Sequence, residues 1–190
     1  MRVITGTAKG RRLKTVDGTE LVRPTSDRVK EAIFSIIQFD IPGSKVLDLF
    51  AGSGQLGIEA LSRGAALCVF TDSSRTAQEV VKDNLKSTGL FSAARVVGTD
   101  AAAFLNGTRD SFDIALLDPP YHQELIPAVL PALTEKMSDR GIIICEHAAD
   151  EHLPEECGSY AVAKRHKFGK IMLSVYRRTA SAAQERNDSK

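Results

Sequence analysis

The residues best suited to chemistry are Asp118, Pro119, Pro120 and Tyr121, which directly follow the apolar run 112–117. The run is expected to form a strand, and two consecutive prolines prevent a helix from starting immediately after it. The result is a stiff loop that presents a carboxylate, backbone carbonyls and an aromatic ring. A carboxylate and a carbonyl can accept both hydrogens of an NH2 group while the ring stacks on a flat partner. The loop therefore suits a planar substrate with an amine, although such loops also occur as plain turns.

A glycine-rich loop is the second chemical feature of the chain. Residues 44–50 read as a buried strand that contains Asp48, and the strand leads into Gly52, Gly54 and Gly57 before a helical pattern. Glycines at a strand-to-helix turn let the backbone approach a ligand closely. The next expected strand ends at Asp72, 20 residues after Gly52. This separation is typical of an acid that binds ribose hydroxyls in a Rossmann-type site.

The three glycines also match the dinucleotide fingerprint, so a nicotinamide-dependent oxidoreductase is an alternative. Asp48 argues against it, because its charge would lie beside a pyrophosphate at the helix N-terminus. The Asp118 loop, moreover, has no role in hydride transfer. The order of acid, glycines, acid and Asp-Pro-Pro-Tyr resembles that of amino-methyltransferases that use S-adenosylmethionine (SAM). SAM carries a sulfonium, an ammonium and a ribose without a phosphate, and these groups suit the acids of the chain.

The elements that must position these residues alternate between strand and helix. The expected strands are 44–50, 67–71, 94–97, 112–117 and 141–146, followed by an antiparallel pair at 159–166 and 170–177; the expected helices are 55–63, 74–87, a short one from residue 101, and 124–136. This alternation predicts an α/β fold with a mostly parallel sheet, helices on both faces and ligands at the carboxyl ends of the strands. Four acids fall at such ends, namely Asp48, Asp72, Asp100 and Asp118.

The composition fits one α/β domain with an appendage. The chain has 190 residues, of which 43% are hydrophobic, and it contains neither an apolar run of membrane-spanning length nor a signal-peptide core. A cytoplasmic, monomeric protein without membrane contact is therefore expected. The three cysteines read as buried hydrophobic residues. A zinc site is not favoured because its candidate ligands match no structural zinc spacing, these being Cys145, His147, His152 and Cys157.

Positive charge is concentrated at the two ends of the chain. Residues 1–30 contain eight lysines and arginines against three acids, and residues 164–190 contain eight against two, while the whole chain has a net charge of +1. The segment between them is correspondingly acidic. Basic ends around an acidic body indicate a face that binds a polyanion, and we favour a nucleic acid over mere solvation of the surface.

Up to about Arg178, the chain resembles the RsmD family of bacterial methyltransferases. The similar stretches are 2–4, 9–13, 23–34, 47–54, 56–65 and 112–121. Members of this family modify the exocyclic amine of a guanine in small-subunit (16S) ribosomal RNA. The resemblance implies a class I SAM-dependent methyltransferase fold with a Rossmann-like sheet of seven strands. It also implies an N-terminal β/α extension over residues 1–42 and a SAM-binding catalytic domain over 43–178. Within the extension, residues 2–22 read as short strands and turns, and Thr25 or Ser26 can cap a helix that opens at Asp27. Residues 179–190 are polar and are expected to be disordered.

The resemblance also assigns roles by position. The Asp118 to Tyr121 loop would hold the target amine and base. The cofactor-binding residues would be Asp48, Phe50, Ala51, Gly52, Ser53, Gly54, Asp72, Asp100 and Ala101. Among them, Asp72 would bind the ribose hydroxyls and Asp100 the adenine amine, whereas Asp48 would support the loop. The RNA-binding residues would be Lys9, Arg11, Arg12, Arg23 and Arg28. No metal is implied, and the partner would be ribosomal RNA within a small-subunit particle.

Other functions remain open at this point. One is methylation of an adenine amine in DNA or in another RNA, although a DNA enzyme would usually need a target-recognition domain for which 190 residues leave no room. Another is a non-catalytic RNA-binding relative, which should have lost Asp118 or Tyr121. The chain departs from the family pattern at Gln55, where a small residue is usual, at Asp72, where Glu is usual, and at Lys167, near a common arginine.

Overall fold

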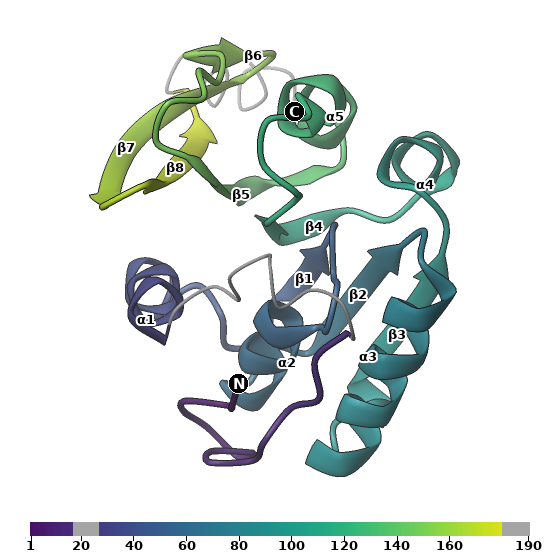
Figure 1. Ribbon diagram of the computed structural model, residues 1–190. Helices are drawn as coiled ribbons and strands as arrows, with labels where there is room; N and C mark the ends of the chain where they lie inside the picture. Colours follow the sequence, from purple (N-terminus) through teal and green to yellow (C-terminus); the bar gives the residue numbers. More distant parts are fainter. Residues whose placement is uncertain (17–26, 180–190) are drawn as a thin grey trace.

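Five apolar runs of the sequence pair in parallel as the core of one sheet (Figure 1). The computed structural model describes residues 1–16 and 27–179. The strands are β1 (Lys45–Asp48), β2 (Leu67–Asp72), β3 (Ala94–Gly98), β4 (Phe112–Leu117), β5 (Met137–Ala148), β6 (Glu156–Cys157), β7 (Tyr160–Phe168) and β8 (Ile171–Arg178). Their order across the sheet is β3-β2-β1-β4-β5-β8-β7-β6. Pairing is parallel from β3 to β5 and antiparallel from β5 to β6.

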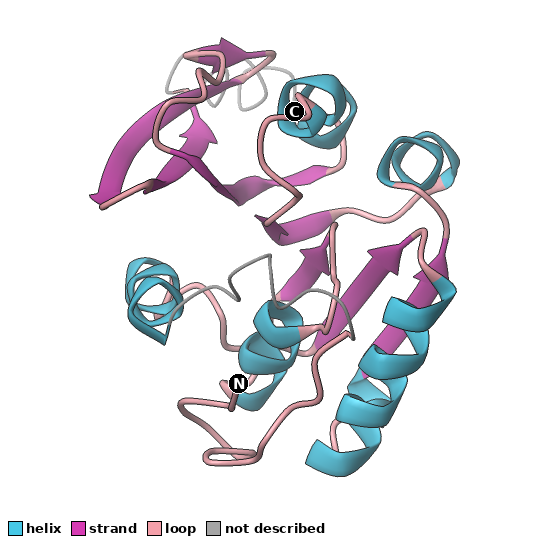
Figure 2. Cartoon of the chain, in the orientation of Figure 1, coloured by secondary structure: helices cyan, strands magenta, loops and turns pink. Residues whose placement is uncertain are grey.

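Helices cover both faces of the sheet, as the alternation predicted (Figure 2). They are α1 (Asp27–Ile36), α2 (Gln55–Ser62), α3 (Arg75–Thr88), α4 (Ala101–Gly107) and α5 (Leu125–Thr134), with a 3-10 turn at Phe91–Ala93. The ends of α3 show how the sequence fixes these boundaries. The Ser74 side chain accepts a hydrogen bond from the Ala77 N–H at the first turn, and Gly89 ends the helix with a φ of 75°.

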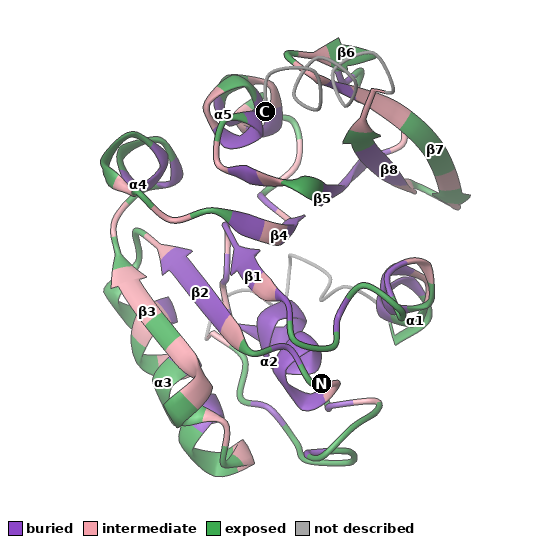
Figure 3. Cartoon of the chain, turned by 180° about the vertical axis from the view of Figure 1, so that it is seen from behind, coloured by how far each residue is buried: buried purple, intermediate pink, exposed green. Residues whose placement is uncertain are grey.

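Two hydrophobic cores lie on opposite faces of the sheet. One joins α1, α2 and α3 to the sheet and includes Phe34, Ile58 and Phe70. The other joins α4 and α5 to the sheet and includes Phe104 and Leu130. Helix α2 is buried along its whole length (Figure 3). Because α2 directly follows the glycine loop, that loop rests on a rigid, fully packed helix.

The N-terminal segment packs onto the first core and does not form a core of its own within the described residues. Val3, Ala8 and Leu13 are all buried there. Glu59 of α2 holds the segment in place, because its carboxylate accepts hydrogen bonds from the N–H groups of Ile4 and Thr5 at 2.8 and 2.9 Å. The amino-terminal segment is thereby fixed to the same helix that supports the glycine loop.

Two details of the expected fold were wrong. The sheet has eight strands instead of seven, because the two-residue β6 pairs with β7 at the edge, and so short a strand leaves no pattern in a sequence. In the described part of residues 2–22, the expected strands are reduced to an isolated bridge between Arg2 and Arg12. The helix cap predicted at Thr25 or Ser26, the RNA contact predicted for Arg23, and residues 180–190 lie outside the described residues.

Candidate active site at the carboxyl edge of the sheet

The four acids predicted at strand ends do lie along one edge of the sheet. Asp48 and Asp72 are the last residues of β1 and β2, Asp118 directly follows β4, and Asp100 lies two residues after β3. Since β3, β2, β1 and β4 are neighbours in that order, the acids follow one another along the edge. The strand order thus confirms that the glycine loop and the Asp118 loop open onto the same side of the molecule.

Asp72 joins the glycine loop to the start of α3 through its two carboxylate oxygens. One oxygen accepts from the Gly52 N–H at 2.9 Å, and the other accepts from the Ser74 N–H at 2.8 Å. On the opposite side of the loop, the Asn84 amide donates to the Ser53 carbonyl at 2.9 Å. Asn84 is buried on α3, and the sequence analysis missed it because an asparagine in a helix gives no motif.

The three glycines of the loop serve different purposes. A Cβ on Gly52 would meet no protein atom within 4 Å, whereas a Cβ on Gly57 would lie 2.3 Å from the Phe70 ring. Gly57 is therefore required for packing of α2 on β2. Gly52 and Gly54 have φ values of 51° and 76°, in the left-handed region that favours glycine. The open space in front of Gly52 and the acids nearby fit a ligand that carries cationic and hydroxyl groups, such as SAM.

Asp48 is buried beneath the loop, with 1% of its surface exposed. Its carboxylate accepts a hydrogen bond from the Gly57 N–H at 2.9 Å. Burial, together with the negative charges of Asp118 and Asp72, raises the pKa of Asp48 to about 7, although the Gly57 hydrogen bond opposes this rise. In this position, Asp48 ties the end of β1 to the start of α2.

The raised pKa of Asp48 predicts that the folded state is less stable at neutral pH than at mildly acidic pH. The folded protein retains a proton that the unfolded chain releases near pH 4, so stability should fall as pH rises from about 4 to about 7 and then level off. We expect urea unfolding to show that the free energy of unfolding decreases on the order of 1–3 kcal/mol between pH 5 and pH 8. The Asp48→Asn variant, which cannot ionise, should lack this component. An equal pH dependence in both proteins would contradict the assignment.

The Asp118 loop is held at its far end by two glutamates that the sequence analysis missed. The Tyr121 hydroxyl donates to Glu146 Oε1 at 2.8 Å, and the His122 N–H donates to Glu151 Oε1 at 2.9 Å. Glu146 is a buried residue of β5. Burial and the neighbouring Glu146 carboxylate raise the pKa of Tyr121 above its ordinary value. Tyr121 therefore stays a neutral hydrogen-bond donor with its ring orientation fixed.

Backbone strain follows immediately after Tyr121. His122 and Glu124 have φ values of 60° and 53°, which non-glycine residues adopt only at a cost. Glu151 offsets this cost, because its second oxygen accepts from the Ala148 N–H at 2.8 Å and clamps the loop to the end of β5. Such strain commonly occurs where a loop must present its residues in one particular geometry.

The remaining predicted cofactor residues surround the same edge. The exposed Asp100 caps α4 by accepting from the Ala103 N–H at 2.9 Å. Ala51 is buried, Phe50 is partly buried, and Ala101 is a buried residue in the first turn of α4. These contacts are structural, and the roles of Asp100, Phe50 and Ala101 in binding a cofactor stay predictions.

The predicted RNA-binding residues that the structure describes lie at two different places. Lys9 and Arg11 are exposed around a turn that packs against the end of α2: the Thr7 N–H donates to the Ser62 carbonyl at 2.8 Å. That end of α2 is the one remote from the glycine loop, so the turn lies at the opposite edge of the sheet from the acids (Figure 1). Arg28, at the start of α1, lies instead with its guanidinium over the Phe168 ring.

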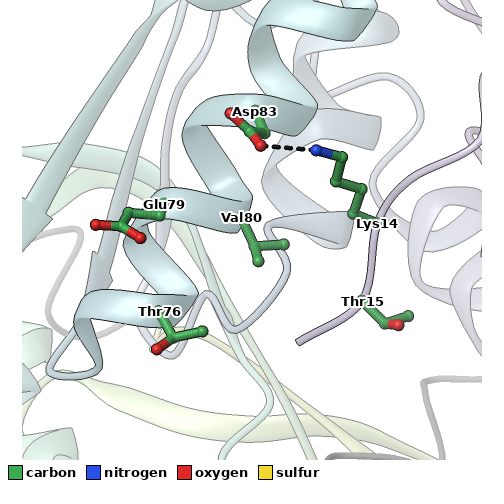
Figure 4. Close-up of a pocket in the computed structure, with 6 residues that line it drawn as sticks. All are labelled: Lys14, Thr15, Thr76, Glu79, Val80 and Asp83. Carbon is green, nitrogen blue, oxygen red and sulfur yellow. Dashed lines mark hydrogen bonds and ion pairs between the residues drawn. The ribbon is translucent and has the colours of Figure 1, made fainter. Parts of the chain in front are cut away.

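Two other features of the described residues involve none of the four acids. A hollow of about 470 Å³ between the N-terminal segment and α3 is crossed by an ion pair from Lys14 to Asp83 at 2.8 Å (Figure 4). Both ring nitrogens of His147, one of the weighed zinc ligands, lie within hydrogen-bond distance of Ser174 and the Ala148 carbonyl. No cluster of three metal-binding side chains and no helix able to span a membrane occurs among the described residues.

Comparisons with known proteins agree with this geometry. Residues 1–177 match the model of a family described as conserved hypothetical protein 95. The chain is 41% identical over 183 residues to YlbH of Bacillus subtilis (strain 168), a protein provisionally named as an rRNA methyltransferase, with 94% of this chain and 99% of that protein covered. It is 32% identical over 187 residues to the ribosomal RNA small subunit methyltransferase D of Escherichia coli (strain K12), with 97% and 93% covered.

Solved structures show the same architecture over 80% or more of the chain. The Escherichia coli protein yhhF, provisionally named as a methyltransferase, superimposes with a TM-score of 0.82 at 31% identity, covering 95% of this chain and 98% of that one. A conserved hypothetical protein of Streptococcus pyogenes gives a TM-score of 0.74 at 35% identity, with 80% and 96% covered.

Proposed function

We propose the following function on the ground that this chain belongs to the family described as conserved hypothetical protein 95, the RsmD family. The protein transfers a methyl group from SAM to the exocyclic amine of a guanine in small-subunit ribosomal RNA. One observation carries the proposal. The Asp118 loop and the glycine loop follow the neighbouring strands β4 and β1 and open at the same edge of the sheet. A cofactor held by the glycine loop and an amine held by the Asp118 loop would therefore lie side by side.

SAM supplies an electrophilic methyl group on its sulfonium when bound. The backbone of Ala51 to Gly54 would hold its methionine part, Asp72 its ribose and Asp100 its adenine amine. Asp48 would act only through the loop that it supports. This arrangement is consistent with the open space in front of Gly52 and with the acids on three neighbouring strands.

The guanine amine is a poor nucleophile because its lone pair is conjugated with the ring. Asp118 and the Pro119 carbonyl would accept its two hydrogens and favour a pyramidal nitrogen with the lone pair directed at the methyl group. Alignment of this kind can lower a barrier by about 7–11 kcal/mol. The Asp118 carboxylate would also stabilise the positive charge that develops on the nitrogen.

Tyr121 would stack on a target base that has left its helix or loop. Its hydroxyl is held by Glu146 at 2.8 Å, which restricts rotation of the side chain and so would fix the plane of the ring that meets the base. Glu146 is therefore a positioning residue in this mechanism. It acts on the base through Tyr121 and has no contact with the reacting atoms.

Ribosomal RNA is the favoured substrate because two full-length relatives carry rRNA methyltransferase names and because the basic ends of the chain suit a polyanion. The substrate is a small-subunit particle, and the enzyme acts as a monomer. Methylation of an adenine amine in DNA would use the same loop, so the assay must offer both nucleic acids.

The decisive experiment uses small ribosomal subunits from a strain that lacks the protein. The purified protein and labelled SAM should transfer a methyl group to one guanine of the 16S RNA, and mass spectrometry of the nucleosides should identify N2-methylguanosine. Bare 16S RNA and duplex DNA at the same salt concentration serve as comparisons. Transfer to adenine, or better activity on duplex DNA, would overturn the proposal.

The Asp72→Ala variant should bind SAM about 10- to 100-fold more weakly. The change removes the carboxylate proposed for the ribose and the hydrogen bonds that it accepts from the Gly52 and Ser74 N–H groups, and hydrogen bonds to a charged group contribute about 1.5–3 kcal/mol each. Calorimetry measures the affinity, and thermal unfolding shows whether the variant is folded. Asp83→Ala is the matched control, because it removes an exposed acid of α3 whose partner is Lys14 of the N-terminal segment. Unchanged affinity in a folded Asp72 variant would refute the role of Asp72.

A further inference from the structure

The tip of the β7–β8 hairpin lies at the same edge of the sheet as the candidate active site. β8 is antiparallel to β5, so Ile171 at its start is paired with Ala148 at the end of β5. The hairpin turn, residues 168–171, therefore lies beside the carboxyl ends of the parallel strands. The Ala149 N–H fixes it there by donating to the Lys170 carbonyl at 2.9 Å.

The turn is close to the reacting groups by the geometry of the sheet. β7 is separated from β4 by β8 and β5, and neighbouring strands lie about 4.8 Å apart, so the turn lies on the order of 15 Å from the end of β4. Asp118 directly follows that end. A polynucleotide with a base in the Asp118 loop can therefore reach the turn with its neighbouring nucleotides.

The turn and the last residues of β7 carry exposed positive charge. Lys167 and Lys170 are both exposed, and within the described residues neither forms an ion pair. Arg28 of α1 adds a third cation, because its guanidinium lies 5.8 Å from the centre of the Phe168 ring. Phe168 itself packs against the core beneath α1, so this ring holds Arg28 at the turn.

The nearby acids are already engaged with other groups. Both oxygens of Glu151 accept backbone hydrogen bonds from His122 and Ala148, and Asp150 lies 3.9 Å from the His122 ring. The Lys9 and Arg11 turn, by contrast, lies at the opposite edge of the sheet (Figure 1). Among the described residues, the cations beside the candidate active site on the side of β5 are therefore Arg28, Lys167 and Lys170.

We propose that Arg28, Lys167 and Lys170, which we call the hairpin patch, bind the phosphate backbone of the RNA beside the target nucleotide. This inference rests on the proposed function and adds where the RNA strand leaves the active site. The contacts would be to phosphates, so they would contribute affinity and register without reading the base sequence. The strand would run from the Asp118 loop across the ends of β5 and β8.

The test compares three double variants on small ribosomal subunits from a strain lacking the protein. Lys167→Ala with Lys170→Ala removes two charges of the patch, and Lys167→Arg with Lys170→Arg retains them. Lys82→Ala with Lys86→Ala removes two exposed lysines from α3, toward the edge away from the acids, and serves as the control. Thermal unfolding verifies that each variant is folded, and calorimetry verifies that each binds SAM as the unaltered protein does.

The alanine pair in the patch should weaken binding to the subunits on the order of tenfold and lower the log–log salt slope by about 1.4–1.8 for two lost phosphate contacts. KM for the subunits should rise with kcat unchanged. The arginine pair should retain the affinity and the slope, and the α3 pair should change neither. If the patch and α3 pairs gave equal slopes and equal KM values, the hairpin patch would be excluded while methyl transfer by the unaltered protein still supported the proposed function. Absence of that transfer would instead refute the proposed function.

Discussion

Asp118→Ala should reduce kcat for methyl transfer by about 100- to 1000-fold, the loss typical for removal of one group that stabilises charge in a transition state. The carboxylate at the end of β4 would hold the amine and offset the positive charge that develops on its nitrogen. That interaction strengthens as the reaction proceeds, so its loss should lower kcat more than it changes the binding of RNA or SAM. Single-turnover kinetics with saturating SAM and RNA measure the effect.

Two comparison variants make the result specific. Asp118→Asn retains one acceptor oxygen but no charge, and its activity should lie between the unaltered protein and the alanine variant. Asp150→Asn removes an exposed acid near the same loop, where its side chain is 81% exposed, and should be nearly fully active. Turnover close to normal in Asp118→Ala, with the protein folded, would eliminate Asp118 from the mechanism.

The largest expected effect on stability comes from Glu59→Ala. Glu59 is fully buried, and its carboxylate lies 3.3 Å from the ammonium of Lys30, which is also fully buried, and 2.8 Å from the guanidinium of Arg63. It also accepts from the Ile4 and Thr5 N–H groups. Removing one partner of a buried ion pair costs about 3–5 kcal/mol, because the other charge is left uncompensated. Burial also lowers the pKa of Lys30, because the ammonium group is removed from water.

Thermal unfolding should show a decrease in Tm of about 6–20 °C for Glu59→Ala, since 1 kcal/mol corresponds to about 2–4 °C in a chain of this size. A double variant, Glu59→Gln with Lys30→Met, removes both charges and keeps most of the volume, so it should be more stable than Glu59→Ala. Glu79→Ala, which breaks an exposed pair with Arg75 on α3, should change Tm little. A Glu59→Ala variant as stable as the Glu79 control would show that the N-terminal segment is held by its apolar contacts alone.

The same variant connects stability with the active site. Glu59 belongs to α2, and α2 begins directly after the glycine loop. Release of Ile4 and Thr5 would loosen the packing of the N-terminal segment against this helix. The contacts that hold the N-terminal segment and those that support the cofactor loop thus share one buried helix.

The strands, their parallel arrangement and the row of acids could all be predicted from the order of residues along the chain. Each apolar run is followed by a polar end, and alternation with helices leaves few topologies other than a parallel sheet covered on both faces. In such a sheet, residues at the carboxyl ends must lie at one edge. Asp48, Asp72, Asp100 and Asp118 could therefore be placed together without a structure, as could the loops that carry them.

The side chains that hold those loops in place can be identified only from the folded structure. Glu146 holds Tyr121 from a strand 25 residues further along the chain, and Asn84 reaches Ser53 from α3. Neither contact has a sequence pattern, because each depends on how two elements pack and not on their spacing along the chain. The same applies to Gly57, which matches a ligand-binding fingerprint but is required by its contact with Phe70.

The edge of the sheet at which each basic residue lies also depends on the folded structure. Both ends of the chain are basic, and no pattern along the chain separates Lys9 and Arg11 from Arg28. Packing against the end of α2 places the first two at the edge of the sheet away from the acids, whereas the antiparallel register of β8 on β5 brings Lys167 and Lys170 to the edge with them. Net charge adds up along a chain, but the side of the sheet on which each charge lies depends on strand direction and register, which long-range pairing sets.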